Sequence, residues 1–225
     1  MAFAEEWDKC YADNAQMSIW PWSDLVSLVM RHGRPFSPAT RILEIGCGAG
    51  ANIPFFLSLG VDYYAVEGSP FVVARLQEKY PELSSKIAAA DFTVNIPFAG
   101  KFDLVIDRSS MTHNDTISIQ RGLGRLYDLL VPQGKYIGVD WFSTEHSEFS
   151  MGIECGDGFT KSSFSEGQFK GVGQVHFSDR QHLCELFEGF TMIVMEHKKV
   201  YRYLGEQDMS LFAAWNFVAE KRCAL

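Results

Sequence analysis

One stretch near the start of the chain decides its fold: Leu43-Glu44-Ile45-Gly46-Cys47-Gly48-Ala49-Gly50. It completes a short apolar run that begins at Arg41, which is typical of a buried β-strand. The three glycines then permit a tight turn and let the backbone approach a ligand closely. A helix is predicted to follow over 51–59, and its first turn offers unpaired N–H groups and a positive dipole end. A strand, a glycine turn and a helix in this order indicate a ligand-binding turn.

The rest of the chain alternates between β-rich runs and helical stretches, the pattern of a parallel sheet covered on both faces. The last two runs have no helix between them and face each other across a loop at Gly205. The predicted strands cover 41–45, 61–66, 86–90, 102–107, 135–142, 191–196 and 211–219, and the predicted helices cover 51–59, 69–80, 116–130 and 179–187. We therefore expect an α/β fold of Rossmann-like type in a single domain over 1–225. Its sheet should be doubly wound, seven-stranded and mostly parallel, with an antiparallel last strand.

Composition excludes several classes of protein. The 225 residues include 20 Lys and Arg against 28 Asp and Glu, which leaves a net charge of −8 and argues against a nucleic-acid partner. No stretch approaches the roughly 20 apolar residues that a membrane span requires. The five cysteines are scattered and form no CxxC pair, so neither a disulfide framework nor a structural zinc site is expected. The N-terminus does not resemble a signal peptide either, so we expect a cytoplasmic protein. We also expect no bound metal ion.

Two regions lie outside the predicted sheet and helices. Residues 1–35 carry the aromatic side chains of Trp7, Tyr11, Trp20 and Trp22, and we expect them to form an N-terminal cap over the ligand. Residues 143–177 form a glycine-rich stretch of low regularity that is interleaved with phenylalanines. A long segment of this kind inside a compact domain is usually a lid or a binding loop. We expect cap and lid to close the site and exclude water.

The glycine turn has an acidic partner and admits two kinds of cofactor. Glu67 ends the second predicted strand, where a carboxylate can accept both hydrogen bonds from a ribose diol. Gly46, Gly48 and Ala51 satisfy the fingerprint of a dinucleotide site, so a nicotinamide enzyme stays open. Glu44 argues against it, because a carboxylate beside the turn suits a cationic amino group and does not suit a pyrophosphate.

These residues resemble the motifs of the class I S-adenosylmethionine-dependent methyltransferases, whose first motif looks like Leu43–Gly50. The resemblance extends along most of the chain in the same order. Glu67 closes the second strand, Asp91 precedes the aromatic Phe92 after the third, and the fourth runs over 102–107. The usual Pro-Gly-Gly before the fifth strand reads Pro-Gln-Gly at 132–134.

The resemblance implies S-adenosyl-L-methionine as the cofactor and a role for each matching residue. Its methionine part would lie against the turn and its acidic neighbour, its ribose on the carboxylate that ends the second strand, and its adenine beside the third strand. Asp107 stands where the fourth strand of this family meets both cofactor and substrate. The implied cofactor-binding residues are Glu44, Gly46, Gly48, Glu67, Gly68, Ser69, Asp91, Phe92 and Asp107.

The chemistry is expected beyond the fourth and fifth strands, because open α/β sheets bind ligands past the carboxyl ends of their strands. His113 is the candidate general base, since the pKa of an imidazole lies near neutral pH. Asp140 is a second catalytic candidate, which either orients the substrate or only ends the fifth strand. Arg108 either pairs with an anionic substrate or bridges to Asp107, and both options stay open. Trp141 and His146 complete the predicted substrate-binding residues along with Arg108.

Absent motifs narrow the acceptor. The Asp/Asn-Pro-Pro-Tyr/Phe tetrad of enzymes that methylate nucleic-acid amino groups is missing after the fourth strand, and so is a Pro-Cys nucleophile. The metal triad of catechol-type enzymes has no clear match. We therefore expect metal-independent methylation of a small molecule. The alternatives are a nicotinamide-dependent oxidoreductase and a non-catalytic S-adenosylmethionine-binding subunit, and the sequence leaves a homodimer and the acceptor atom open.

Overall fold

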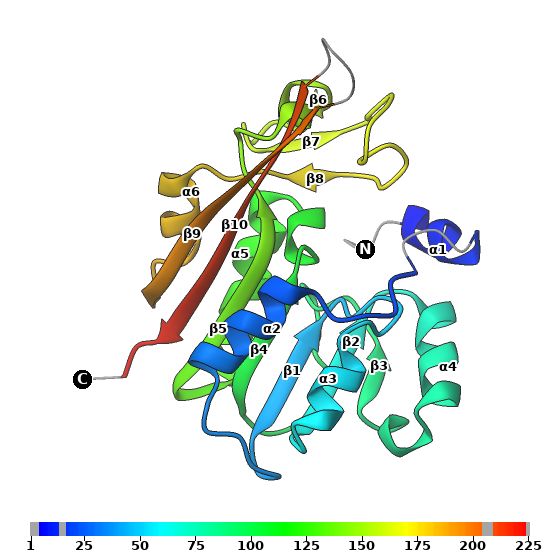
Figure 1. Cartoon of the computed structure of the whole chain (residues 1–225), viewed down its shortest axis with the longest axis vertical. Coiled ribbons are helices and arrows are strands. Elements are labelled where there is room, and N and C mark those ends of the chain that lie inside the picture. The colour runs from blue at the N-terminus through cyan, green and yellow to red at the C-terminus, as the bar shows by residue number, and fades with distance from the viewer. Residues whose placement is uncertain (1–4, 14–16, 204–208, 224–225) are drawn as a thin grey trace.

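The structure is a computed structural model that describes residues 5–13, 17–203 and 209–223. Its centre is a seven-stranded sheet with helices on both faces, and a small three-stranded sheet lies at one end (Figure 1). No helix in the described ranges is long and apolar enough to cross a membrane.

The helices and strands follow the predicted alternation. The helices are α1 Glu5–Ala12, α2 Ser23–His32, α3 Ile53–Ser58, α4 Pro70–Lys79, α5 Thr116–Leu129 and α6 Arg180–Leu186, with short 3-10 turns at Pro81–Leu83, Met111–His113 and Ser147–Ser150. The strands are β1 Arg41–Ile45, β2 Asp62–Glu67, β3 Ile87–Ala89, β4 Phe102–Arg108, β5 Leu130–Phe142, β6 Ile153–Glu154, β7 Thr160–Ser162, β8 Val175–His176, β9 Phe190–Tyr203 and β10 Met209–Lys221.

The main sheet has the strand order β3-β2-β1-β4-β5-β10-β9. The strands from β1 to β5 run parallel, whereas β10 is antiparallel to both β5 and β9. This confirms the predicted fold class. The strand order reverses between β1 and β4, and such a switch point is where open α/β sheets bind their ligands.

Alternate side chains of the strands enter two separate cores, one on each face of the sheet. Ile42 of β1 faces the core that contains α2, α3 and α4, whereas the next residue, Leu43, faces the core that contains α5 and α6. Both side chains are fully buried. The central strands are therefore apolar on both faces, and polar groups are left for the strand ends.

Two predicted boundaries need correction. Strand β5 begins at Leu130 rather than at 135, because the register against β4 shifts after the pair Phe102–Leu130 and resumes at Leu104–Lys135. Strands β9 and β10 pair from Phe190 to Lys221 and form a longer hairpin than predicted. The expected loop at Gly205 lies outside the described residues.

The insertion 143–177 is more regular than predicted. Strands β6, β7 and β8 form an antiparallel sheet within it. A third hydrophobic cluster, which includes Phe164, Phe169 and Phe177, is buried between this sheet and Phe142 at the end of β5. The phenylalanines that appeared scattered along the sequence therefore build a small core of their own.

Candidate active site

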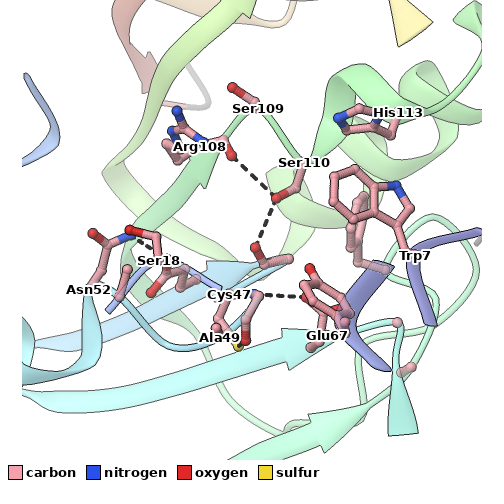
Figure 2. Close-up of a pocket in the computed structure, with 18 of the residues that line it drawn as sticks. Trp7, Ser18, Cys47, Ala49, Asn52, Glu67, Arg108, Ser109, Ser110 and His113 are labelled. Carbon is pink, nitrogen blue, oxygen red and sulfur yellow. Dashed lines mark hydrogen bonds between the residues drawn. The ribbon is translucent and has the colours of Figure 1, made fainter. Parts of the chain in front are cut away.

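A cavity opens at the carboxyl ends of β1, β2, β3 and β4, beside the switch point of the sheet (Figure 2). Its walls combine the glycine turn, the ends of these strands and the N-terminal region. The lining residues are Trp7, Tyr11, Ser18, Trp22, Glu44, Gly46, Cys47, Gly48, Ala49, Ala51, Asn52, Glu67, Gly68, Ala90, Asp91, Phe92, Arg108, Ser109, Ser110, His113 and Asn114.

Two glycines of the turn, Gly46 and Gly48, could not carry a side chain without strain. Gly46 and Gly48 adopt φ angles of 60° and 50°, in the left-handed region that favours glycine. A Cβ atom on Gly46 would collide with Ser110, whose hydroxyl donates to the Gly46 carbonyl at 2.9 Å. One on Gly48 would lie 3.2 Å from the hydroxyl of Tyr11. Ser110, in the loop after β4, thus holds the turn on one side, and Tyr11 of α1 lies against it on the other.

Glu44 lies behind the turn with both carboxylate oxygens engaged. It accepts hydrogen bonds from the Tyr63 hydroxyl at 2.5 Å and from Nδ2 of Asn52 at 2.7 Å. Burial raises the pKa of Glu44 to about 7, although both donors favour the charged form. Asn52 stands at the N-cap of α3 but does not cap it. Its Oδ1 is buried and has no hydrogen-bond partner among the described residues, so an acceptor is left over at the cavity wall.

Glu67, at the end of β2, also lines the cavity. Its carboxylate accepts from the backbone N–H of Gly48 at 2.9 Å and of Ser69 at 3.1 Å. Burial raises the pKa of Glu67, and these backbone donors oppose the shift. A carboxylate can accept about four hydrogen bonds in total, so capacity remains for a ligand.

Of the residues predicted to bind the adenine and the ribose edge, Asp91 and Phe92 lie at the cavity and Ser69 does not. Asp91 and Phe92 line the cavity, and Asp91 is oriented by Thr93, whose N–H and hydroxyl donate to its Oδ1 at 2.9 and 2.6 Å. Ser69 is fully buried and does not line the cavity. It caps α4 by accepting from Val72 and hydrogen-bonds Asp8 of α1. The structure thus places Ser69 where it holds α1 beside the cavity.

Asp107 and Trp141 lie in the core rather than on the cavity wall, which corrects two expectations. Asp107 accepts from Nε1 of Trp141 at 2.6 Å and from the Tyr136 hydroxyl at 2.9 Å. It also accepts from the backbone N–H groups of Ser110 and Met111 at 2.8 and 3.2 Å. Both side chains are fully buried, and burial raises the pKa of Asp107 to about 6. Asp107 therefore fixes the loop after β4.

His113 lines the cavity beside Trp7 of α1, with the ring centroids 4.8 Å apart in an edge-on arrangement. Its Nδ1 lies 3.3 Å from the backbone carbonyl oxygen of Gln174 in the insertion. A carbonyl oxygen only accepts, so we assign the proton to Nδ1, which leaves a lone pair on Nε2. Burial lowers the pKa of His113 to about 4, and the ring is neutral at pH 7.

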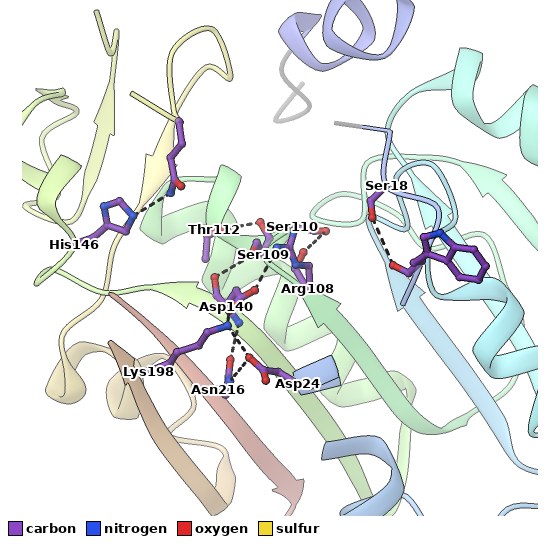
Figure 3. A network of polar contacts seen from close by, with 12 residues as sticks. Ser18, Asp24, Arg108, Ser109, Ser110, Thr112, Asp140, His146, Lys198 and Asn216 are labelled. Atoms are coloured by element: carbon purple, nitrogen blue, oxygen red, sulfur yellow. Dashed lines mark hydrogen bonds and ion pairs between the residues drawn. The ribbon is translucent and has the colours of Figure 1, made fainter. Parts of the chain in front are cut away.

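Asp140 is buried and belongs to a polar network rather than to the cavity wall (Figure 3). One carboxylate oxygen lies 3.2 Å from Nη2 of Arg108, and the other lies 3.0 Å from Nζ of Lys198. Asp24 of α2 is 2.6 Å from the same Lys198 nitrogen. Because both oxygens face cations, Asp140 orients Arg108 and is not free to act as a base.

His146 lies in the insertion, away from the cavity wall. It is buried, its Nδ1 accepts from the backbone N–H of Glu148 at 3.1 Å, and its ring packs against Phe169 and Phe212. The predicted contact of His146 with substrate therefore has no counterpart in this arrangement.

Comparison with known proteins relates the chain to methyltransferases. The sequence matches a methyltransferase-domain family model over residues 43–136. An S-adenosylmethionine-dependent methyltransferase from Methanosarcina mazei has a similar structure, with a TM-score of 0.67 and 15% identity over 87% of this chain and 98% of that one. Residues 43–136 thus carry a methyltransferase domain, and the chain resembles the class I S-adenosylmethionine-dependent methyltransferases in fold.

Two further structures share the fold of this methyltransferase. The 1,6-didemethyltoxoflavin N1-methyltransferase of Burkholderia thailandensis, solved with 1,6-didemethyltoxoflavin and S-adenosylhomocysteine, has a TM-score of 0.68 and 18% identity over 97% of this chain and 87% of that one. The N-methyltransferase NodS of Bradyrhizobium japonicum, solved with S-adenosylhomocysteine, has a TM-score of 0.57 and 16% identity over 87% and 82%. A search of curated proteins found no sequence match.

The N-terminal region of the methyltransferase reaches the cavity with three of its four predicted aromatic residues. Trp7 and Tyr11 come from α1, which packs near α4, and Trp22 precedes α2. Trp20 does not line the cavity and is 73% exposed. The cap thus contributes a wall, built mainly from α1.

Sequence reasoning missed two lining residues of the methyltransferase that organise its site. Asn52 opens a helix, a position where asparagine is ordinarily explained by helix capping. Ser110 comes two residues after β4 and holds the glycine turn through Gly46. A signal for Asn52 did exist, since an amide close to Glu44 and the turn can pair with that carboxylate.

Proposed function

We propose that the protein transfers the methyl group of S-adenosylmethionine to a small-molecule acceptor, without a metal ion. The observation that carries the proposal is the acceptor-rich end of the cavity. There the buried Oδ1 of Asn52 lacks a partner, and the carboxylates of Glu44 and Glu67 flank the glycine turn. An ammonium group and a ribose diol are the donors that such a surface would satisfy.

The residues present fit this cofactor. We assign the ammonium of the methionine part to Oδ1 of Asn52, with the negative charge of Glu44 behind it at 2.7 Å from Nδ2. Glu67 would accept the ribose hydroxyls with its remaining lone pairs, and Gly48 leaves the space for them. Asp91 and Phe92 would hold the adenine by a hydrogen bond and by packing.

When bound, S-adenosylmethionine supplies a methyl group on a sulfonium, which is already a good leaving group. The protein then has to position the acceptor and exclude water. Neutral His113 offers the lone pair of Nε2 to an N–H or O–H of the acceptor and so orients its attacking atom. A pKa of about 4 makes this imidazole a weak base, so its role is mainly orientation.

The small-molecule part of the proposal is supported by the fold and by the cavity. The Burkholderia thailandensis enzyme binds 1,6-didemethyltoxoflavin, a small molecule. In the present chain the cavity is bounded by α1, Trp22 and Arg108 rather than by an extended basic surface. Within the described ranges, no group of three or more His, Cys, Asp or Glu side chains is placed to hold a metal ion, and metal independence stays a prediction.

Calorimetric titration with S-adenosylmethionine, S-adenosylhomocysteine and reduced nicotinamide dinucleotide tests the cofactor. We expect micromolar binding of the two sulfur ligands alone. Glu67→Gln should weaken S-adenosylhomocysteine binding at least about tenfold, because it removes a charged acceptor of two hydrogen bonds. Glu78→Gln on the exposed surface of α4 makes the same chemical change outside the cavity and should leave the affinity unchanged.

Three outcomes would contradict parts of the proposal. Binding of the nicotinamide in place of the sulfur ligands would assign the site to hydride transfer. Equal affinity in wild type and Glu67→Gln, with both proteins melting as folded chains, would remove the ribose assignment. A protein that binds S-adenosylhomocysteine but methylates no member of an acceptor library would fit the non-catalytic subunit.

A further inference from the structure

We propose that the acceptor is a small acid whose carboxylate or phosphate group binds Arg108. This inference rests on the proposed function, because it concerns the other ligand of the same cavity. It selects one of the two options that the sequence left open for Arg108. The bridge to Asp107 does not form, since the Asp107 oxygens accept from Tyr136, Trp141 and the loop after β4.

The first observation is that Arg108 has unused donors at the cavity wall. A guanidinium group has five N–H donors. Within the described part of the chain, one hydrogen bond engages them, from Nη2 to Asp140 at 3.2 Å, and Nε is buried without a partner. Asp140 also pairs with Lys198 through its other oxygen, so it does not grip the guanidinium with both oxygens.

The second observation is that Arg108 is held ready for a ligand. Its guanidinium carbon lies over the Trp22 ring, 3.7 Å from the ring centroid, so the indole packs against the group. Asp140 fixes it from within the protein, and Lys198 and Asp24 fix Asp140 in turn (Figure 3). A planar, fixed guanidinium matches the geometry of a carboxylate or phosphate and loses little conformational freedom on binding.

The third observation is the uneven charge of the cavity. Among the described lining residues Arg108 is the one Lys or Arg, whereas Glu44, Glu67 and Asp91 are all acidic. Arg108 lies across the cavity from Glu67, toward the side of His113 (Figure 2). The acidic end suits the cationic and hydroxyl groups of the cofactor, and Arg108 is left for an anion. A neutral oxygen would accept from these donors more weakly than a carboxylate or phosphate does.

An anionic group at Arg108 has two sources, because the methionine part of the cofactor also carries a carboxylate. The two sources differ in an observable way. If Arg108 held the cofactor, its replacement would weaken S-adenosylhomocysteine but not 5′-methylthioadenosine, which lacks the amino acid part. If it holds the acceptor, neither cofactor analogue is affected.

The test compares wild type, Arg108→Met, Arg108→Lys and a control, Arg75→Met, which removes an exposed charge from α4. Calorimetry first measures S-adenosylhomocysteine and 5′-methylthioadenosine, and a wild type that binds neither would refute the proposed function before any acid is tested. The protein saturated with S-adenosylhomocysteine is then titrated with three pairs of probes. These are benzoate and benzamide, indole-3-acetate and indole-3-acetamide, and phenyl phosphate and phenol.

We expect wild type and Arg75→Met to bind at least one acid about tenfold or more tightly than its neutral partner. Arg108→Met should abolish this preference while it binds both cofactor analogues within about twofold of wild type. Arg108→Lys should retain part of the preference, because it keeps the charge without the planar fork. If Arg108→Met does not fold, Arg108→Lys still tests the proposal.

Either of two results would overturn the proposal. One is equal binding, or none, of acid and neutral partner for all three pairs in the loaded wild type. The other is a loss of S-adenosylhomocysteine affinity in Arg108→Met with 5′-methylthioadenosine unchanged, which would assign Arg108 to the carboxylate of the cofactor.

Discussion

Glu44 shows how one buried side chain makes the binding of a cation depend on pH. The residue is 2% exposed, and burial raises its pKa to about 7 despite the hydrogen bonds from Tyr63 and Asn52. A ligand ammonium on Asn52 favours the ionised form of Glu44, because opposite charges stabilise each other in a buried site. The free protein must therefore release a proton below pH 7 before it binds the cation well.

We expect the affinity for S-adenosylhomocysteine to be roughly five- to tenfold lower at pH 6 than at pH 7.5, since one linked proton changes affinity up to about tenfold per pH unit. Calorimetry across this range measures it. Binding of 5′-methylthioadenosine, which has no ammonium group, is the internal control and should change little. Glu44→Gln should flatten the profile for S-adenosylhomocysteine. An unchanged slope in this variant would show that another group titrates.

At the scale of elements, the first residues of β5 depart from the usual Pro-Gly-Gly. Gln133 occupies the middle position with a φ angle of 62°. A left-handed conformation costs a residue with a Cβ atom roughly 1–2 kcal/mol, a cost that glycine avoids. The side chain of Gln133 is exposed, so its removal loses little packing.

We expect Gln133→Gly to raise the free energy of unfolding by about 0.5–1 kcal/mol, because relief of the strained φ outweighs the added entropy of glycine in the unfolded chain. Urea unfolding measures the change. Gln120→Gly makes the same substitution at an exposed position inside α5. There glycine should lower the free energy of unfolding by roughly 1 kcal/mol. A destabilised Gln133→Gly would mean that its side chain makes contacts that outweigh the strain.

The elements also show why the sequence predicted some site residues and not others. Gly46, Gly48, Glu67 and Asp91 line the cavity as expected, because turns at strand ends on one edge of a parallel sheet must meet. Asp107 did not, because neighbouring residues of a strand point to opposite faces. The motif predicted where β4 ends but not which of its last two side chains, Asp107 or Arg108, lines the cavity.

Contacts between residues far apart in the sequence were the other feature that the sequence did not predict. Asp140 was expected near the substrate and instead lies between two cations, one of which is Lys198 on β9. The contact of His113 with Gln174 depends on how the insertion packs. Residues 143–177 were predicted to form a lid, but the spacing of their phenylalanines has neither helical nor strand periodicity, so the small sheet and its core were not predictable.

At the scale of the whole molecule, a chain of buried hydrogen bonds joins the insertion to α6. Thr160 of β7 donates to Asp157 at 2.7 Å, so its oxygen accepts from Nδ1 of His176, 3.0 Å away. Nε2 of His176 must then accept from Nε2 of His182 on α6, at 3.1 Å. A second proton on His176 would leave two N–H groups pointing at each other. Burial, together with His182, lowers the pKa of His176 to about 3.

These buried hydrogen bonds should make the fold sensitive to mild acid. The folded protein keeps His176 neutral down to about pH 3, whereas the unfolded chain protonates it near pH 6.5. Neutral His176 therefore contributes fully to the free energy of unfolding above pH 6.5. Below pH 6.5 this contribution falls by about 1.4 kcal/mol for each pH unit. We expect the free energy of unfolding of wild type, relative to His176→Gln, to fall by about 2 kcal/mol between pH 6.5 and 5, as measured by urea unfolding.

Glu44 and Asp107, whose raised pKa values act in the opposite direction, are present in both proteins and cancel in the difference. A difference that does not vary with pH would show that the pKa of His176 is the same in the folded and unfolded protein, which would contradict its lowered pKa.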